Sequence, residues 1–519
     1  MAPPIPGGPF AMPMYRDFVP KAVRPWIYLA FAVCFLLTGF FYLGAAGSIA
    51  GTRSLMREDV MFIGMCNVVG VNMPFPFLFR FKFRFTNRQL LLNAALGLAV
   101  CNLLATQVTY VPLLCVLAFI SGFLKLCGTF ECFSNIQLWM TPKRDFAIFF
   151  PLIYIVIVGD MHLQSWLATN VTYYCGSWEN VNYIMAGVML TIALLVFCLT
   201  RNFRFMKPLP LVSLDWLGCV LWSLLMIEFV FIFNYGEYFN WSDSPLWRQA
   251  VIVFVLTLVM TVMRMRRIRH PYIAPQAFTY KNVVPMLALF FVAEWLNSTP
   301  KVLQNAFTGS VLHWGSLTLS RFELYAWCGN LVGCLFTMFW MKVLHNKYTS
   351  LLIVGGFAML SYQVMMYFMV MPGLNIECFI VPILVRSFGY AIYFTALTVY
   401  LHDIMPFQHF FMGLTMTGLM RNGTVGSMMS GLYGFAMRYS VADNAVRALQ
   451  YDSTQLVLVS IKRLYGFTCL LGVVFVVVLM LYNVQPVRST LKKLPYWNVL
   501  GRKARRLFRH DVRTHAVEE

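Results

Sequence analysis

The chain has 519 residues, of which 60% are hydrophobic and only 12% are charged, and its mean hydropathy is +0.69. A soluble domain has about a quarter of its residues charged, so this composition excludes a single water-soluble core. The formal net charge of +20 would indicate a nucleic-acid partner only if the basic residues formed one face of a soluble module. They lie instead between apolar runs, so no nucleic-acid partner is expected.

Apolar runs of about twenty residues follow one another along the whole chain, and each is long enough for an α-helix to cross a hydrocarbon layer about 30 Å thick. Runs such as LLGVVFVVVLMLY show no period-two alternation, which argues against a transmembrane β-barrel. The sequence therefore predicts an all-α polytopic membrane protein with about fourteen transmembrane helices. They are expected at residues 25–46, 59–79, 88–107, 110–138, 146–166, 181–200, 214–235, 246–264, 283–306, 321–343, 350–370, 376–401, 408–437 and 463–483.

Basic residues gather in alternate connections between these runs, with two exceptions: the inner turn 402–408 has no Lys or Arg, and the outer loop 438–462 carries several. Residues 80–88, 201–207 and 264–281 are rich in Lys and Arg, whereas 106–110 and 167–181 contain neither. The positive-inside rule then places the basic connections in the cytoplasm and requires an even number of spans. Both termini are predicted to be cytoplasmic, and the first apolar run is too long for a signal-peptide core, so an uncleaved first span is expected.

Charged residues inside the apolar runs are the first candidates for a functional site, because a charge at bilayer depth is costly unless it is paired or hydrated. Lys125 and Glu131 lie six positions apart and face different directions, so each is expected to meet another helix. Glu294 and Lys301 lie seven apart, which predicts a shared stripe facing a cavity. The full set is Glu131, Asp160, Glu228, Glu294, Glu323, Lys125, Lys301, Arg386 and Arg421.

We expect Glu131, Asp160 and Glu294 to carry coupling protons, with Arg386 and Arg421 as conformational or anion-binding partners. The alternative for each is a structural pair that holds two helices together.

Asp160 stands with His162 in the polar run VGDMHLQSW. A buried carboxylate near a histidine suits proton transfer at neutral pH. The competing interpretation is that this run is the outer end of the fifth span, in contact with periplasmic water.

Small residues recur every four positions in RNGTVGSMMSGLYG, which begins at Arg421. Two ridges result. One contains Gly423, Ser427 and Gly431, and the other contains Gly426, Ser430 and Gly434. Such ridges allow neighbouring helices to approach closely, as in a moving helix or in any tight bundle.

Residues 214–247 carry a motif of a known family. Asp215 and Gly218 match a D-x-x-G at the start of a helix, and Gly236, Trp241 and Ser242 match positions after it. This region resembles the seventh span of the fourteen-spanner drug:proton antiporters of the major facilitator superfamily. The segment ILVRSFGYAIYFTAL and the region that follows it are similar to the family's twelfth and thirteenth spans.

The first half departs from the family's signatures. FLFRFKFRFTNRQLLL keeps the basic residues of the motif between spans 2 and 3 but lacks its glycines and aspartate, and Ala118 stands where the fourth span carries arginine. Gly159 and Asp160 replace the antiporter motif of the fifth span, and the acid expected in span 1 is missing. The chain resembles a divergent branch.

The resemblance implies a major facilitator fold with two six-helix bundles and two inserted helices. It divides the chain into a cytoplasmic arm at 1–24, a first bundle at 25–200, inserted helices with a basic linker at 201–282, a second bundle at 283–483 and a basic tail at 484–519. It further implies proton-coupled efflux of small amphipathic or lipophilic compounds by alternating access in a bacterial inner membrane. The implied partners are a small-molecule substrate, protons, membrane lipids and, in a double-membraned organism, a periplasmic adaptor and an outer-membrane channel.

Two other functions remain open at this point. The missing acid in span 1 favours a dedicated exporter of a lipid or secreted metabolite. A membrane-embedded transferase would use His402 and Asp403 in YLHDIMP, but such enzymes have a large soluble loop or a polar cluster at one membrane face. We therefore expect no enzyme activity. No cofactor and no metal site are expected either, because the thirteen cysteines are scattered singly, without a C-x-x-C pair.

Overall fold

The computed structural model describes residues 14–141, 145–204, 210–211, 214–343, 348–447 and 452–483. The first thirteen residues, the predicted tail at 484–519 and the basic residues Lys143, Arg144, Lys207 and Lys347 lie outside the described residues. The described chain is helical, with one isolated antiparallel bridge between Tyr15 and Thr200. It divides into two compact units, residues 1–214 with 315–331, and residues 215–314 with 332–519.

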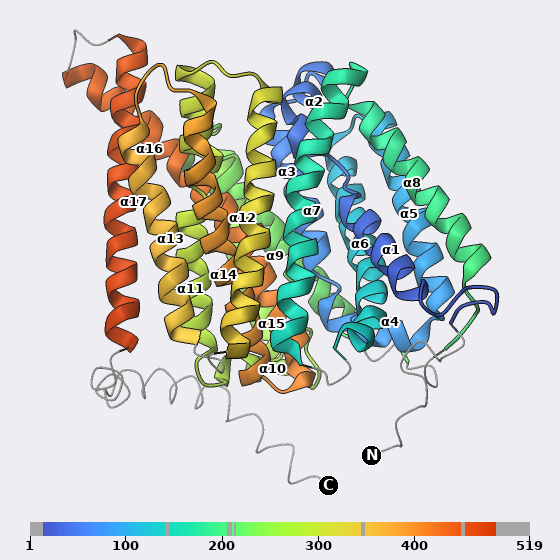
Figure 1. Ribbon diagram of the computed structural model, residues 1–519. Coiled ribbons are helices and arrows are strands. Elements are labelled where there is room, and N and C mark those ends of the chain that lie inside the picture. The colour runs from blue at the N-terminus through green and yellow to red at the C-terminus, as the bar shows by residue number, and fades with distance from the viewer. Residues whose placement is uncertain are drawn as a thin grey trace. The chain divides into compact units, whose positions relative to one another are not determined.

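The first unit contains eight α-helices, drawn blue to green in Figure 1, and the first half of a ninth, drawn yellow. They are α1 (Arg24–Leu37), α2 (Ala46–Arg53), α3 (Arg57–Asn72), α4 (Leu78–Arg84), α5 (Asn87–Gln107), α6 (Val111–Met140), α7 (Phe146–Cys175), α8 (Glu179–Leu199) and residues 316–331 of α12 (Ser316–Val343). Short 3-10 turns, η2 (Leu43–Ala45) and η3 (Phe75–Phe77), precede α2 and α4.

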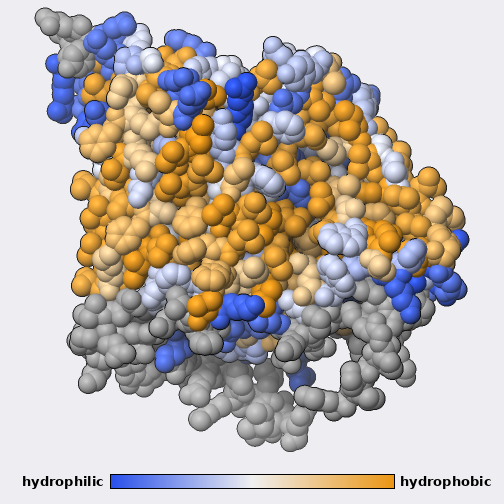
Figure 2. Space-filling model, in the orientation of Figure 1, coloured by the Kyte–Doolittle hydropathy of each residue, from blue (hydrophilic) through white to orange (hydrophobic). Residues whose placement is uncertain are grey.

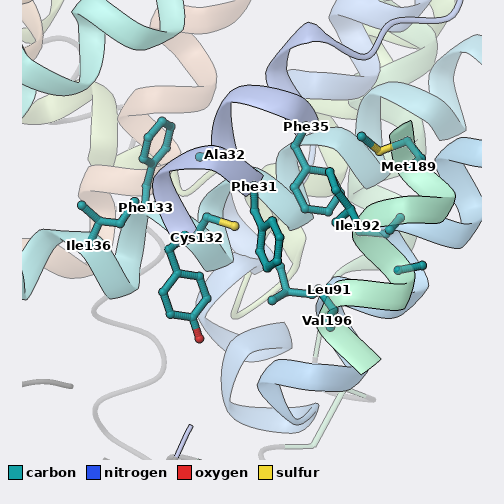
Figure 3. Close-up of a cluster of buried hydrophobic side chains, with 14 of the residues drawn as sticks. Phe31, Ala32, Phe35, Leu91, Cys132, Phe133, Ile136, Met189, Ile192 and Val196 are labelled. Carbon is teal, nitrogen blue, oxygen red and sulfur yellow. The ribbon is translucent and has the colours of Figure 1, made fainter. Parts of the chain in front are cut away.

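The core of the first unit is built from apolar side chains of five helices, α1, α5, α6, α7 and α8. Phe31 and Phe35 of α1 pack with Leu91 of α5, Cys132 of α6 and Ile192 of α8 (Figure 3). Phe35, Leu91 and Cys132 are completely buried. This packing of side chains from distant parts of the sequence holds the helices of the first unit together.

Helices α3 and α6 cross through glycines on both sides. A Cβ atom added to Gly70 would lie 2.1 Å from the carbonyl oxygen of Phe119, and one added to Gly122 would lie 2.1 Å from that of Asn67. By contrast, nothing lies within 4 Å of a Cβ added to Gly47 of α2. The crossing therefore depends on the absence of a side chain at Gly70 and Gly122.

The second unit contains the remaining helices (Figure 1). They are α9 (Trp216–Asn234), α10 (Pro245–Arg267), α11 (Val283–Asn297), residues 332–343 of α12, α13 (Tyr348–Met369), α14 (Ile380–Ile404), α15 (Phe407–Gly418), α16 (Val425–Arg447) and α17 (Ser453–Asn483). Turns of 3-10 helix occur at η4 (Trp241–Asp243), η5 (Pro275–Thr279) and η8 (Ile376–Phe379). Segments of π-helix occur at η6 (Pro300–Gln304), η7 (Phe307–Val311) and η9 (Leu419–Thr424).

Every predicted span contains helix, but four of them are interrupted. The span at 25–46 breaks after Leu37. Seven residues further on, in η2, α7 approaches so closely that a Cβ on Gly44 would lie 2.3 Å from the carbonyl oxygen of Ser165. The span at 59–79 is broken between α3 and α4 by the 3-10 turn η3. The span at 283–306 changes to π-helix at Pro300, because proline cannot donate the usual α-helical hydrogen bond. The span at 408–437 is divided among α15, η9 and α16.

The chain is a multi-pass membrane protein. Twelve described helices are long and apolar enough to cross a membrane, and α1 is a shorter apolar helix. In α10 only 11% of the apolar window is buried within the protein, so its apolar side chains need a lipid environment. Figure 2 shows apolar side chains over the sides of the helices and polar ones toward their ends. The count of fourteen spans stays a prediction.

All thirteen cysteines are free thiols. Most lie inside helices as small apolar residues, which agrees with their single spacing in the sequence. Four have exposed side chains: Cys175, Cys198, Cys328 and Cys378.

Candidate functional site: charged side chains inside the helices

Asp160 lies at the middle of α7 and is 3% exposed. The helix begins at Asp145, whose Oδ1 accepts a hydrogen bond of 3.0 Å from the N–H of Ala147, and it ends before Gly176 in the left-handed conformation. The Oδ2 atom of Asp160 is buried and has no hydrogen-bond partner among the described residues. The basic group that acts electrostatically on this carboxyl is Lys125, at the middle of α6.

The position before Asp160 must be small. A Cβ on Gly159 would lie 2.8 Å from the indole nitrogen of Trp327, which belongs to the first half of α12. The indole thus covers the helix beside the carboxyl. A carboxylate in such surroundings is costly unless a cation or a proton neutralises it.

His162 lies two residues further along α7 and binds Glu323 of α12. Its Nδ1 atom is 2.6 Å from Oε2 of Glu323, and the hydroxyl of Ser165 donates to the other carboxylate oxygen at 3.4 Å. Both partners are partly exposed, at 21% and 34%. The run VGDMHLQSW lies in the middle of α7, which continues as helix to Cys175, and its placement at the outer end of the span stays an open alternative.

Glu131 of α6 is 1% exposed and forms an ion pair with Lys82 of α4, with 3.6 Å between Oε2 and Nζ. Asn135 joins the two charges, since its amide donates to Glu131 at 3.2 Å and its carbonyl accepts from Lys82 at 3.0 Å. Lys82 also donates to the hydroxyl of Ser134.

The separation of Lys125 from Glu131 was predicted correctly, because each meets a different helix. Lys82, predicted to lie in a cytoplasmic connection, is part of a helix rather than of an open loop. Its side chain is buried in the first unit, because α4 prolongs the second span to Arg84 and Lys82 there meets Glu131.

In the second unit, two polar pairs join α11 to α14. The hydroxyl of Tyr390 donates to Glu294 at 2.6 Å, and one turn away Nη1 of Arg386 donates to Asn297 at 3.4 Å. Glu294 is 4% exposed, whereas Arg386 is half-buried. Lys301 is exposed, so the predicted stripe shared with Glu294 does not form, because the helix changes to π-helix between them.

The small-residue segment contains a close contact. Arg421 and Gly423 lie in the π-helical η9, and their side-chain environments are outside the described part. Ser427 and Gly426 are buried at the start of α16. A Cβ on Gly431 would lie 2.4 Å from the carbonyl oxygen of Phe233 in α9, so this ridge brings two helices together.

Asp215 of the D-x-x-G motif begins α9 and holds it to α10. Its Oδ1 accepts from the N–H of Gly218 at 2.9 Å and from Nη2 and Nε of Arg264 at 2.6 and 2.9 Å. Oδ2 accepts from the N–H of Tyr272 at 3.1 Å. The motif revealed Asp215, but nothing in its local sequence indicated Arg264 as its partner.

His402 and Asp403, the candidates for a transferase, lie at the end of α14. Nδ1 of His402 is 3.5 Å from the Asp403 carboxylate, which also accepts a hydrogen bond from Tyr348. Within the described ranges, no three His, Cys, Asp or Glu side chains come together as metal ligands.

The apolar helices define an all-α polytopic membrane protein, and its likeness to a solved transporter gives it the major facilitator fold. The chain is similar in structure to a solved, auto-inhibited POT family peptide transporter, with a TM-score of 0.54 and 15% identity over 87% of this chain and 96% of that chain. It also matches a variant of the nucleoside transporter NupG, with a TM-score of 0.49 and 11% identity over 88% and 99% of the two chains. No protein-family model and no curated protein matches the chain. The likeness shows the fold, and membership of the drug:proton antiporter family stays a prediction.

Proposed function

We propose that the chain is a secondary active transporter in which Asp160 carries the coupling proton. The observation that carries the proposal is a buried carboxyl at the middle of a spanning helix, with an oxygen that no described group satisfies and with Lys125 as its electrostatic partner. Likeness of fold to a peptide transporter supports a transport role.

Asp160 and Lys125 provide a chemical switch. The ionised carboxylate attracts the Lys125 ammonium and holds α7 to α6. A proton on Asp160 removes that attraction, so the two helices are no longer held by charge. Because α6 and α7 both belong to the first unit, proton binding would change this unit's preferred conformation and thereby the access of substrate.

The proposed direction is export of small amphipathic or lipophilic compounds across a bacterial inner membrane, with both termini in the cytoplasm. This follows from the resemblance of residues 214–247 to drug:proton antiporters and from the basic connections. A periplasmic adaptor and an outer-membrane channel belong to the same proposal.

The test is gradient-driven transport in proteoliposomes with three fluorescent probes of one shape: 1-naphthoate, 1-naphthol and 1-naphthylmethylammonium. We expect the wild type to accumulate at least one probe under an imposed pH gradient. Asp160→Asn should abolish this accumulation and keep exchange of the same probe at equal pH. Asp452 is exposed and directly precedes α17, so Asp452→Asn is the matched control and should transport normally.

Two further variants locate the proton carrier. Glu131→Gln and Glu294→Gln are measured in the same vesicles. Full gradient-driven accumulation by Asp160→Asn would refute the role of Asp160. If accumulation is lost only in Glu131→Gln or only in Glu294→Gln, the residue changed in that variant is the proton carrier. A wild type that moves none of the three probes would count against export of small amphipathic compounds.

A further inference from the structure

Arg386 is a cation inside a spanning helix whose described contacts are all neutral. Its Nη1 reaches Asn297 at 3.4 Å, and its guanidinium carbon lies 5.7 Å from the centre of the Tyr362 ring. The Nε atom is buried and has no hydrogen-bond partner among the described residues. No described carboxylate lies within 4.0 Å of it.

Three other cations inside the helices have an acidic side chain as an ion-pair or electrostatic partner. Lys82 is paired with Glu131, and Arg264 of α10 is paired with Asp215. Lys125 has Asp160 as its electrostatic partner. Arg386 thus differs from these groups, since a guanidinium inside a membrane span is costly without an anion or water beside it.

The carboxylate of Glu294, one turn before Asn297 on α11, already accepts a hydrogen bond. Glu294 accepts the hydroxyl hydrogen of Tyr390, and this pair lies one helical turn from the pair of Arg386 and Asn297. The two pairs therefore place a bound acid and an unneutralised guanidinium side by side between α11 and α14. Arg386 is also half-buried rather than enclosed, so part of its side chain is accessible.

We propose that Arg386 binds an anionic group of the transported solute, a carboxylate or a group of similar geometry. The guanidinium offers a planar set of donors that fits two acceptor oxygens, and Nε is a donor that remains to be satisfied. The amide of Asn297 and the ring of Tyr362 then flank the bound group. This inference rests on the proposed transport function and adds the chemical class of the substrate.

The test is equilibrium binding to the full-length protein in detergent, at one pH and without a gradient. The three naphthyl probes of equal shape are titrated while tryptophan fluorescence is followed. We expect the wild type to bind 1-naphthoate more tightly than the alcohol or the amine. Arg386→Gln should weaken 1-naphthoate binding by about 10- to 100-fold and remove the preference for the anion.

Three variants separate this role from a structural one. Arg386→Lys keeps the positive charge but lacks the planar set of donors, so the preference for the anion should persist with reduced affinity. Glu294→Gln removes a nearby negative charge and should tighten 1-naphthoate binding. Arg248→Gln, at an exposed position of α10 in the same unit, should bind like the wild type. If Arg386→Gln does not fold, the affinity of Arg386→Lys for 1-naphthoate is compared with that of Arg248→Gln. A lower affinity in Arg386→Lys supports the inference, and an equal affinity overturns it.

An unchanged affinity for 1-naphthoate in folded Arg386→Gln would overturn the inference, as would wild-type protein that prefers the amine or binds none of the three probes. This outcome is separate from the test of Asp160, because binding at one pH needs no proton gradient. Anion binding through Arg386 together with normal transport by Asp160→Asn would leave this inference standing and reject the proton carrier.

Discussion

Removal of the Asp215 carboxylate is the perturbation whose effect the structure defines most fully. The side chain accepts hydrogen bonds from the N–H of Gly218, from two nitrogens of Arg264 and from the N–H of Tyr272. It therefore caps α9, binds α10 and fixes the chain that follows α10. We expect Asp215→Ala to destabilise the second unit more than any exposed acidic residue does.

The magnitude can be worked out from these contacts. Loss of a helix cap costs about 1 kcal/mol. Breaking a fully buried ion pair costs about 3–5 kcal/mol, but the Arg264 side chain is 27% exposed and can turn to water, so we take about 2 kcal/mol. The free energy of unfolding should thus fall by about 3 kcal/mol for Asp215→Ala and by about 2 kcal/mol for Asp215→Asn, which keeps a capping side chain.

The assay is reversible unfolding in detergent micelles by titration with SDS, followed by tryptophan fluorescence. Asp243→Ala, at an exposed position of the same unit, is the control. Arg264→Gln in the Asp215→Ala background should add little further loss, because the pair is already broken. The reasoning is refuted if Asp215→Ala and Asp243→Ala unfold at the same SDS fraction.

Three more variants test contacts within single units. Gly122→Ala should lower the melting temperature by several degrees, because the added Cβ meets a backbone carbonyl oxygen of α3, whereas Gly47→Ala should leave it unchanged. Lys82→Met should cost about 3–5 kcal/mol of unfolding free energy in the SDS assay, and a second change, Glu131→Leu, should restore most of it. Hydrogen bonds from arginines of α16 and α17 hold the pKa of Asp443 below its usual value, so this acid stabilises the fold above about pH 4 and the contribution is lost as pH falls through the lowered pKa. Between pH 6 and pH 3 the melting temperature of Asp443→Asn should therefore fall less than that of the wild type; equal slopes would contradict this assignment.

The positions of the helices were predictable because a span needs an apolar run of fixed length. The interruptions were not. The apolar run continues past Leu37, where α1 ends, and Gly44 further along it looks like any small residue, although it lies against the backbone of Ser165 in α7. Hydropathy averages over a window and does not detect such a contact.

The buried charges were predictable, but their partners were not. Asp160, Glu131 and Glu294 stood out as acids in apolar surroundings. The partners Lys82 and Tyr390 come from distant helices, and Lys82 occurs in a basic run that has the composition of a cytoplasmic loop. Pairing of this kind depends on which helices pack together, which a single sequence does not specify.

The exposed thiols give the chain its own markers of sidedness. Cys175 is the last residue of α7 and lies in a connection predicted to be periplasmic, and Cys378 lies at the predicted periplasmic end of the span at 376–401. Cys198 lies at the predicted cytoplasmic end of α8. A maleimide that cannot cross membranes should thus label Cys175 and Cys378 in intact cells and reach Cys198 only after the membrane is opened. The native sequence can report its own orientation without a fused reporter or an introduced residue.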